Sequence, residues 1–144
     1  MSARTKKEVF LTELLSVLRS QYPEWNVRDH CKIAWRSQPE IIWPQADLLI
    51  PEPRVIVECD ENSDPGRSLT KYWPLIDLGR GGHLTVIEVW KRGPTFGFGF
   101  AELAKWMGRK LMRLYPSFRY EFIERRDETA DTIAKQIAQI VKQI

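Results

Sequence analysis

The sequence predicts an α/β domain of three layers, in which a mixed five-stranded sheet is flanked by helices on both faces. Two observations lead to this fold class. Apolar segments rich in β-branched and aromatic residues recur along the 144 residues, and segments with helical apolar spacing lie before, between and after them. No repeat, low-complexity segment or linker divides the chain, so residues 1–144 are expected to form a single domain.

The first element is a helix over residues 8–22. Thr5 followed by Glu8 forms a capping box, and apolar residues then repeat at helical spacing until Pro23. Residues 25–36 have the mixed β-branched and aromatic character of a strand.

The next two strands are residues 46–50 and 54–60. A short loop with two prolines separates them, so we expect a hairpin of antiparallel neighbours. If the loop is residues 51–54, Ile50 pairs with Val55, and this pairing fixes the register of the hairpin.

A helix within residues 63–82 follows, and Pro74 either kinks or restarts it. Residues 84–90 are the next strand. Because a helix separates this strand from residues 54–60, the two strands should run parallel through a right-handed crossover.

The last three elements are a helix that begins at Phe100, a strand over residues 118–124 and a closing helix. The helix from Phe100 has apolar residues at helical spacing, which predicts a buried stripe. The members of that stripe are Phe100, Leu103, Ala104, Met107, Leu111 and Leu114.

Charge is unevenly distributed. Residues 1–64 hold 8 Lys and Arg against 11 Asp and Glu, a net charge of −3, whereas residues 65–144 hold 14 against 8, a net charge of +6. This distribution fits a protein that binds cations in one place and phosphates in another, and it also fits chance. No apolar stretch is long enough to span a membrane, and the N-terminus lacks the apolar core of a signal peptide, so we expect a soluble, cytoplasmic protein without a membrane partner.

Acidic residues gather where the predicted hairpin ends. The register sets Asp47 opposite Glu58, with Cβ atoms about 5 Å apart, and strand alternation puts Asp60 on the same face about 7 Å further along. Like charges placed this way repel one another unless a cation lies between them. Carboxylate oxygens suit Mg²⁺ or Mn²⁺, and no cluster of His or Cys indicates zinc. The alternative is a solvated strand end.

An Asp at the start of one strand, Glu-x-Asp at the end of its hairpin partner and a crossover helix behind them resemble the PD-(D/E)XK nuclease superfamily, the restriction-endonuclease-like fold. The resemblance implies that Asp47 and Glu58 hold the metal ion that activates water against a phosphodiester. Members often add an acid from the first helix. Glu13 is the candidate here, because Glu8 is already the capping partner of Thr5.

The sequence departs from the family pattern at two positions. The proline that usually precedes the first acid stands three residues earlier, as Pro44, and the lysine expected two residues after Glu58 is Asp60. In some branches an acid at this position completes the metal site, and in others the base lies on the following helix. Lys71 and Arg67 are so placed. Lys71 is preferred for proton transfer, because an arginine keeps its proton, and Arg67 is expected to clamp a phosphate; both also fit exposed cations that balance the acids.

Two basic segments are candidate nucleic-acid contacts. Lys105, Arg109 and Arg113 form a ladder along one predicted helix, which could follow a phosphate backbone, although any surface helix has a charged face. Lys91 and Arg92 precede phenylalanines that alternate with glycines, and such aromatics either stack on unpaired bases or anchor a loop.

The sequence therefore favours a metal-dependent endodeoxyribonuclease that uses one or two Mg²⁺ or Mn²⁺ ions and acts on DNA, with a homodimer possible because one small subunit would cut one strand. In this hypothesis Asp47, Glu58, Asp60 and Lys71 are catalytic, and the three acids bind the metal. The alternative is a nuclease-fold domain that has lost catalysis and binds nucleic acid or a protein. A third hypothesis is an interaction protein with no nucleic-acid role.

Overall fold

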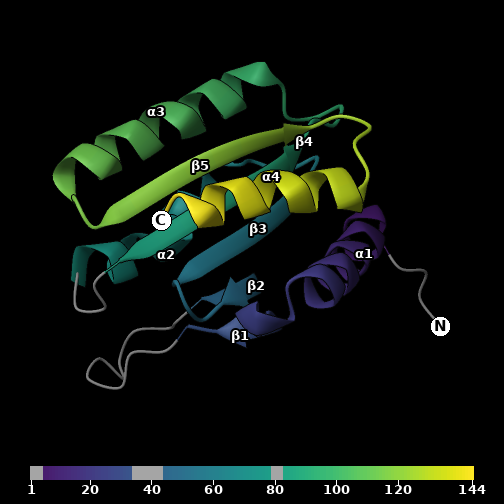
Figure 1. Ribbon diagram of the computed structural model, residues 1–144. Helices are drawn as coiled ribbons and strands as arrows, with labels where there is room; N and C mark the ends of the chain where they lie inside the picture. The colour runs from purple at the N-terminus through teal and green to yellow at the C-terminus, as the bar shows by residue number, and fades with distance from the viewer. Residues whose placement is uncertain (1–4, 34–43, 79–82) are drawn as a thin grey trace.

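The structure is a computed structural model, which describes residues 5–33, 44–78 and 83–144 and has the predicted mixed sheet of five strands between helices (Figure 1). The strands are β1 (Arg28–Lys32), β2 (Gln45–Ile50), β3 (Val55–Glu61), β4 (Leu84–Lys91) and β5 (Phe118–Arg125). The helices are α1 (Lys6–Gln21), the short 3₁₀ helix η1 (Pro23–Trp25), α2 (Arg67–Leu78), α3 (Phe98–Leu114) and α4 (Ala130–Lys142). The ends of the segments predicted over residues 25–36 and 63–82 lie outside the described residues.

The sheet has the strand order β1-β2-β3-β4-β5. The first three strands are antiparallel neighbours, and β3, β4 and β5 run parallel. Parallel neighbours need a crossover connection, which α2 and α3 provide. The predicted parallel pairing across the helix of residues 63–82 is therefore confirmed.

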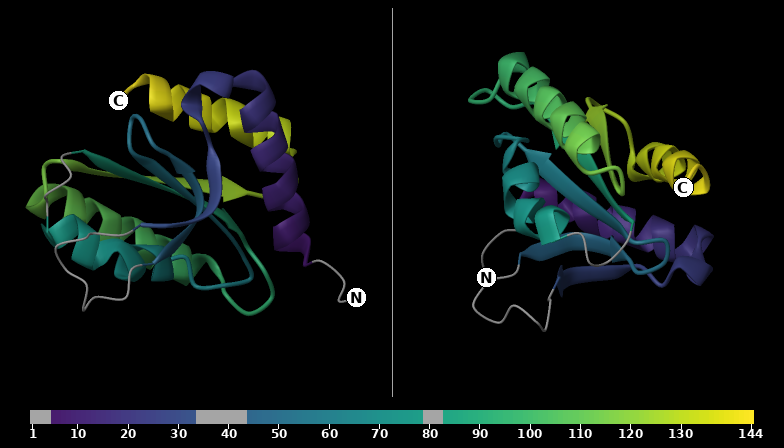
Figure 2. Two further views of the ribbon diagram at one scale, coloured as in Figure 1. Left: turned by 90° about the horizontal axis from the view of Figure 1, so that it is seen from below. Right: turned by 90° about the vertical axis from the view of Figure 1, so that its left-hand side faces the viewer.

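Helices cover both faces of the sheet and complete the three layers. Figure 2 shows α1 and α4 on one face and α2 and α3 on the other. Alternate residues of β3 supply the two cores: Val55 and Val57 pack with α1 and α4, whereas Ile56 packs with α2 and α3. This alternation fixes which face each acid of β3 occupies, because successive side chains point to opposite faces of a sheet.

The register predicted for the hairpin is confirmed, since Ile50 pairs with Val55 and Leu48 with Val57. Regular pairing ends there. At the next position the carboxylate of Asp47 accepts a hydrogen bond of 3.0 Å from the backbone N–H of Cys59. A side chain thus replaces the backbone carbonyl as acceptor, which holds Asp47 against the end of β3.

A local sequence signal explains where α1 begins, whereas the proline within α2 does not interrupt that helix. The capping box between Thr5 and Glu8 is present at the start of α1. Helix α2 continues through Pro74 to Leu78, so the proline does not restart the helix. No helix among the described residues combines the length and the apolar character that a membrane crossing requires.

The apolar stripe predicted for α3 is partly wrong. Leu111 and Ala104 are buried as expected, but Leu103 and Leu114 are 52% and 65% exposed. The helix instead turns its smallest residues toward the sheet, including Gly108, where an added Cβ would lie 2.1 Å from the ring of Tyr120. A close approach of helix and strand therefore determines which face of α3 is buried.

Candidate functional site

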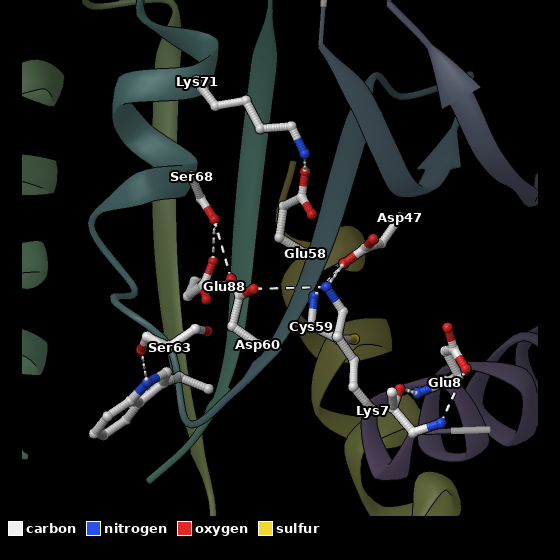
Figure 3. Close-up of polar contacts among 12 residues, drawn as sticks. Lys7, Glu8, Asp47, Glu58, Cys59, Asp60, Ser63, Ser68, Lys71 and Glu88 are labelled. Carbon is white, nitrogen blue, oxygen red and sulfur yellow. Dashed lines mark hydrogen bonds and ion pairs between the residues drawn. The ribbon is translucent and has the colours of Figure 1, made fainter. Parts of the chain in front are cut away.

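An open pocket lies where β3 ends between the first turns of α1 and α2. Its volume is about 480 Å³. The lining residues are Lys7, Asp47, Glu58, Asp60, Arg67, Ser68, Thr70 and Lys71. The three acids predicted as metal ligands and the two cations predicted on the following helix are thus brought to one place, as Figure 3 shows for most of them.

Lys7 lies between two of the acids. Its Nζ atom is 3.3 Å from Asp47 Oδ2 and 3.6 Å from Asp60 Oδ1 (Figure 3). Burial disfavours the charge of Lys7, but the combined attraction of the two carboxylates outweighs burial and raises the pKa of the ammonium. The ammonium thus occupies a point where the surrounding carboxylates stabilise positive charge.

Glu58 is the most deeply placed of the three predicted ligands, with 2% of its surface exposed. Its Oε1 atom accepts hydrogen bonds from Lys71 Nζ at 2.7 Å and from the hydroxyl of Tyr72. Burial, and after it the neighbouring Asp47, raise the pKa of the carboxyl to about 7, because Lys71 offsets only part of their effect. The negative charge of Glu58 is therefore disfavoured by the nearby carboxylate of Asp47 and favoured by the ammonium of Lys71.

A fourth acid lies beneath the pocket. Glu88, from the middle of β4, is fully buried, and its Oε2 atom accepts a hydrogen bond of 2.5 Å from Ser68. The same hydroxyl lies 3.4 Å from Asp60 Oδ2. Burial first, and then the contact with Asp60, raises the pKa of Glu88 well above its ordinary value. Ser68 thus links two carboxyl groups that belong to different strands.

The described residues contain no group of three or more His, Cys, Asp or Glu side chains already arranged to hold a metal ion. Two of the candidate ligands instead share the ammonium of Lys7, and Glu58 is turned to Lys71. The donor set is nevertheless made of carboxylate oxygens, the ligands that Mg²⁺ and Mn²⁺ favour. The ammonium of Lys7 already lies between Asp47 and Asp60, and its side chain is 36% exposed, so a divalent ion at this point would have to take the place of that ammonium.

The other predicted residues do not line this pocket. Glu13 is exposed on α1, and the residue of α1 that reaches the acids is Lys7. Lys91 and Arg92 lie at the end of β4 and line a separate pocket with Phe98 and with residues at the end of β5 and directly after it. Lys105, Arg109 and Arg113 lie along α3. The predicted basic residues other than Arg67 and Lys71 are therefore apart from the acids.

Sequence reasoning did not single out Lys7, Ser68 or Tyr72. Ser68 and Tyr72 are four residues apart on α2, so both side chains lie on one face of the helix. That spacing, together with Lys71, is the signal that these side chains meet the acids of β3. Lys7 gave no such signal, because its contact depends on where α1 begins relative to the sheet.

Comparison of the chain with protein-family models, with curated proteins and with solved structures gave no match. The interpretation of the pocket therefore depends on its geometry. Several carboxylates beside two lysines and an arginine can hold cations, neutralise charge on an anionic substrate and orient water.

Proposed function

We propose that this protein is a metal-dependent nuclease that hydrolyses phosphodiester bonds in DNA. The observation that supports this function best is the convergence of Asp47, Glu58 and Asp60 in one pocket with Arg67 and Lys71 of α2. Acids alone would indicate a cation site. Acids beside an exposed arginine and a lysine indicate a site that holds a cation and an anionic group together.

Each of these side chains has a role that follows from its position. Asp47, Glu58 and Asp60 are the proposed ligands of Mg²⁺ or Mn²⁺, and a bound ion would supply an activated water and neutralise charge on the phosphate. Lys71 is held in the pocket by Glu58 at 2.7 Å, so its ammonium can orient the attacking water and stabilise the charged transition state. Arg67 lines the outer part of the pocket, where its guanidinium can bind two phosphate oxygens.

The placement of Lys71 bears on the main departure from the PD-(D/E)XK pattern. Asp60 stands where the family usually has its lysine, and Lys71 reaches the same pocket from α2. This arrangement supports a resemblance to those members of the superfamily in which the lysine lies on the helix after the acids. One pocket would cut one strand, so cleavage of both strands of a duplex would need two copies of the chain.

A second candidate is a nuclease-fold domain that has lost catalysis and binds nucleic acid. Lys7 favours this candidate, because its ammonium already satisfies Asp47 and Asp60 at 3.3 and 3.6 Å without a metal ion. The two candidates differ in whether a divalent ion displaces Lys7.

The test is cleavage of supercoiled plasmid and of branched DNA in Mg²⁺, in Mn²⁺ and in EDTA. We expect cleavage in either metal, none in EDTA, and a loss of at least a hundredfold in the Asp47→Ala and Glu58→Ala variants, as for removal of other essential catalytic groups. Glu13→Ala is the matched control, because this acid is exposed on α1 and does not line the pocket.

Two results would count against the proposal in different ways. Cleavage that survives both substitutions would mean that another site is responsible. Absence of cleavage on either substrate, with salt-sensitive DNA binding retained, would favour the binding domain instead.

A further inference from the structure

The outward side of α3 carries large apolar residues among its charged ones. Its buried side consists largely of small residues, whereas large apolar residues are left in solvent. The exposed fractions are 48% for Phe98, 40% for Phe100, 52% for Leu103, 50% for Trp106 and 65% for Leu114. Exposed apolar residues grouped on one element are typical of a binding surface.

The charge of the same helix indicates what kind of ligand covers this face. Lys105 pairs with Glu102 at 3.2 Å, but no ion pair within the described part of the chain involves Arg109, Lys110 or Arg113. A second copy of the helix would bring the same three cations against them and be repelled. A polyanion would be attracted.

Cations and aromatic rings alternate on this surface. The guanidinium of Arg92 lies 4.2 Å from the ring centroid of Phe98, and Lys110 Nζ lies 5.6 Å from that of Trp106. Phe98 and Trp106 are about 12 Å apart along the helix axis, at 1.5 Å per residue. Aromatic rings that stack on bases, flanked by cations that meet phosphates, are the combination by which proteins hold unpaired nucleotides.

This surface begins at the same end of the sheet as the pocket of acids. Both α2 and α3 follow parallel strands, so both helices start at the carboxyl ends of those strands. The two helices also touch near the pocket, where the Met107 methyl group lies 2.7 Å from the position of a Cβ added to Gly66, the residue before Arg67. Helix α3 therefore lies beside the start of the helix that lines the pocket of acids.

We propose that the surface formed by Arg92, Phe98, Trp106 and Lys110 binds a single-stranded segment of nucleic acid. The bases of a duplex are stacked within the helix and cannot lie on these rings, so the ligand must offer unpaired nucleotides. Binding of the single strand does not depend on the proposed nuclease function. Only the further statement that this strand is part of the nuclease's substrate rests on that function.

The test is binding of fluorescein-labelled dT15 and of a 15-base-pair duplex in EDTA, followed by anisotropy over a series of salt concentrations. We expect dT15 to bind more tightly than the duplex. Trp106→Ala should weaken binding of dT15 about tenfold and leave duplex binding unchanged, and Trp106→Phe should retain most of the affinity. Lys110→Gln should reduce the dependence on salt concentration.

Val9→Ala is the matched control, because Val9 is an apolar residue 43% exposed on α1, on the opposite face of the sheet. Trp106 is itself half exposed, so its replacement should leave the circular dichroism spectrum and thermal midpoint unchanged. Undetectable binding of dT15, equal or tighter binding of the duplex, or unaltered binding by Trp106→Ala would overturn the inference. Since EDTA prevents metal-dependent hydrolysis, binding of dT15 without any cleavage in Mg²⁺ would refute the nuclease function alone.

Discussion

Replacement of Glu58 by glutamine should change how the stability of the protein depends on pH. The carboxyl is buried, lies beside Asp47 and accepts hydrogen bonds from Lys71 and Tyr72. Its pKa is raised from an ordinary 4.5 to about 7, with burial as the largest cause. Between these two values the folded protein binds more protons than the unfolded chain, so the free energy of unfolding falls as pH rises.

The size of the effect follows from the shift. A shift of one unit corresponds to 1.36 kcal/mol, so the full contribution of Glu58 is about 3 kcal/mol, present below pH 4.5 and lost as pH rises through 7. Glutamine keeps the shape and an acceptor oxygen for Tyr72 and Lys71 but does not titrate. Between pH 4.5 and pH 8 the free energy of unfolding of the variant should therefore fall by about 3 kcal/mol less than that of the wild-type protein.

The assay is urea denaturation of both proteins in EDTA across this pH range. Glu88 is also buried with a raised pKa, and it contributes in the same direction to both proteins. The difference between the two curves thus isolates Glu58. Parallel curves, or a variant that loses more stability with pH than the wild type, would refute the electrostatic account of the pocket.

Four further substitutions test other parts of the structure. Lys7→Met should strengthen Mn²⁺ binding about tenfold, as measured by calorimetry, because it removes two partly exposed ion pairs that compete with the metal and are worth about 0.5–1 kcal/mol each. Unchanged affinity would show that Lys7 is not at the ion site. Lys71→Met should raise the pKa of Glu58 above 7 in an NMR titration, because the ammonium lowers it now; a lower pKa would contradict the contact. Gly108→Ala should destabilise the fold by about 1–3 kcal/mol in urea, because its Cβ would meet an aromatic ring of β5 at 2.1 Å. Gly99→Ala, with open space around it, should instead stabilise α3 by up to about 1 kcal/mol, and equal effects of the two changes would argue against close packing.

Much of the fold was predictable because the signals that specify it are local. The capping box at Thr5 lies within four residues of chain, and the register of β2 and β3 follows from the length of one loop. The parallel pairing of β3 and β4 follows from the helix between them. The register in turn predicts that Asp47 and Glu58 lie near one another, and both line the same pocket.

The buried face of α3 could not be read from its sequence. Its apolar residues form a wide stripe, and periodicity alone does not say which part of that stripe meets the sheet. The answer depends on Gly108 and Ala104, which let the helix approach β5, and on Tyr120, which fills the space beside them. The larger residues Leu103 and Leu114 were left outside as a consequence.

The sequence by itself determined the order of the elements, the mixed sheet and the grouping of three acids at the end of one hairpin, because these depend on periodicity, turns and short connections. Only the tertiary structure decided that Lys7 lies between Asp47 and Asp60, and that Glu88 lies beneath them with Ser68. These contacts join residues far apart in the chain, and they depend on how α1, α2 and β4 are placed against β3. Charge in the pocket is therefore set by packing between elements, which no local pattern in the sequence specifies.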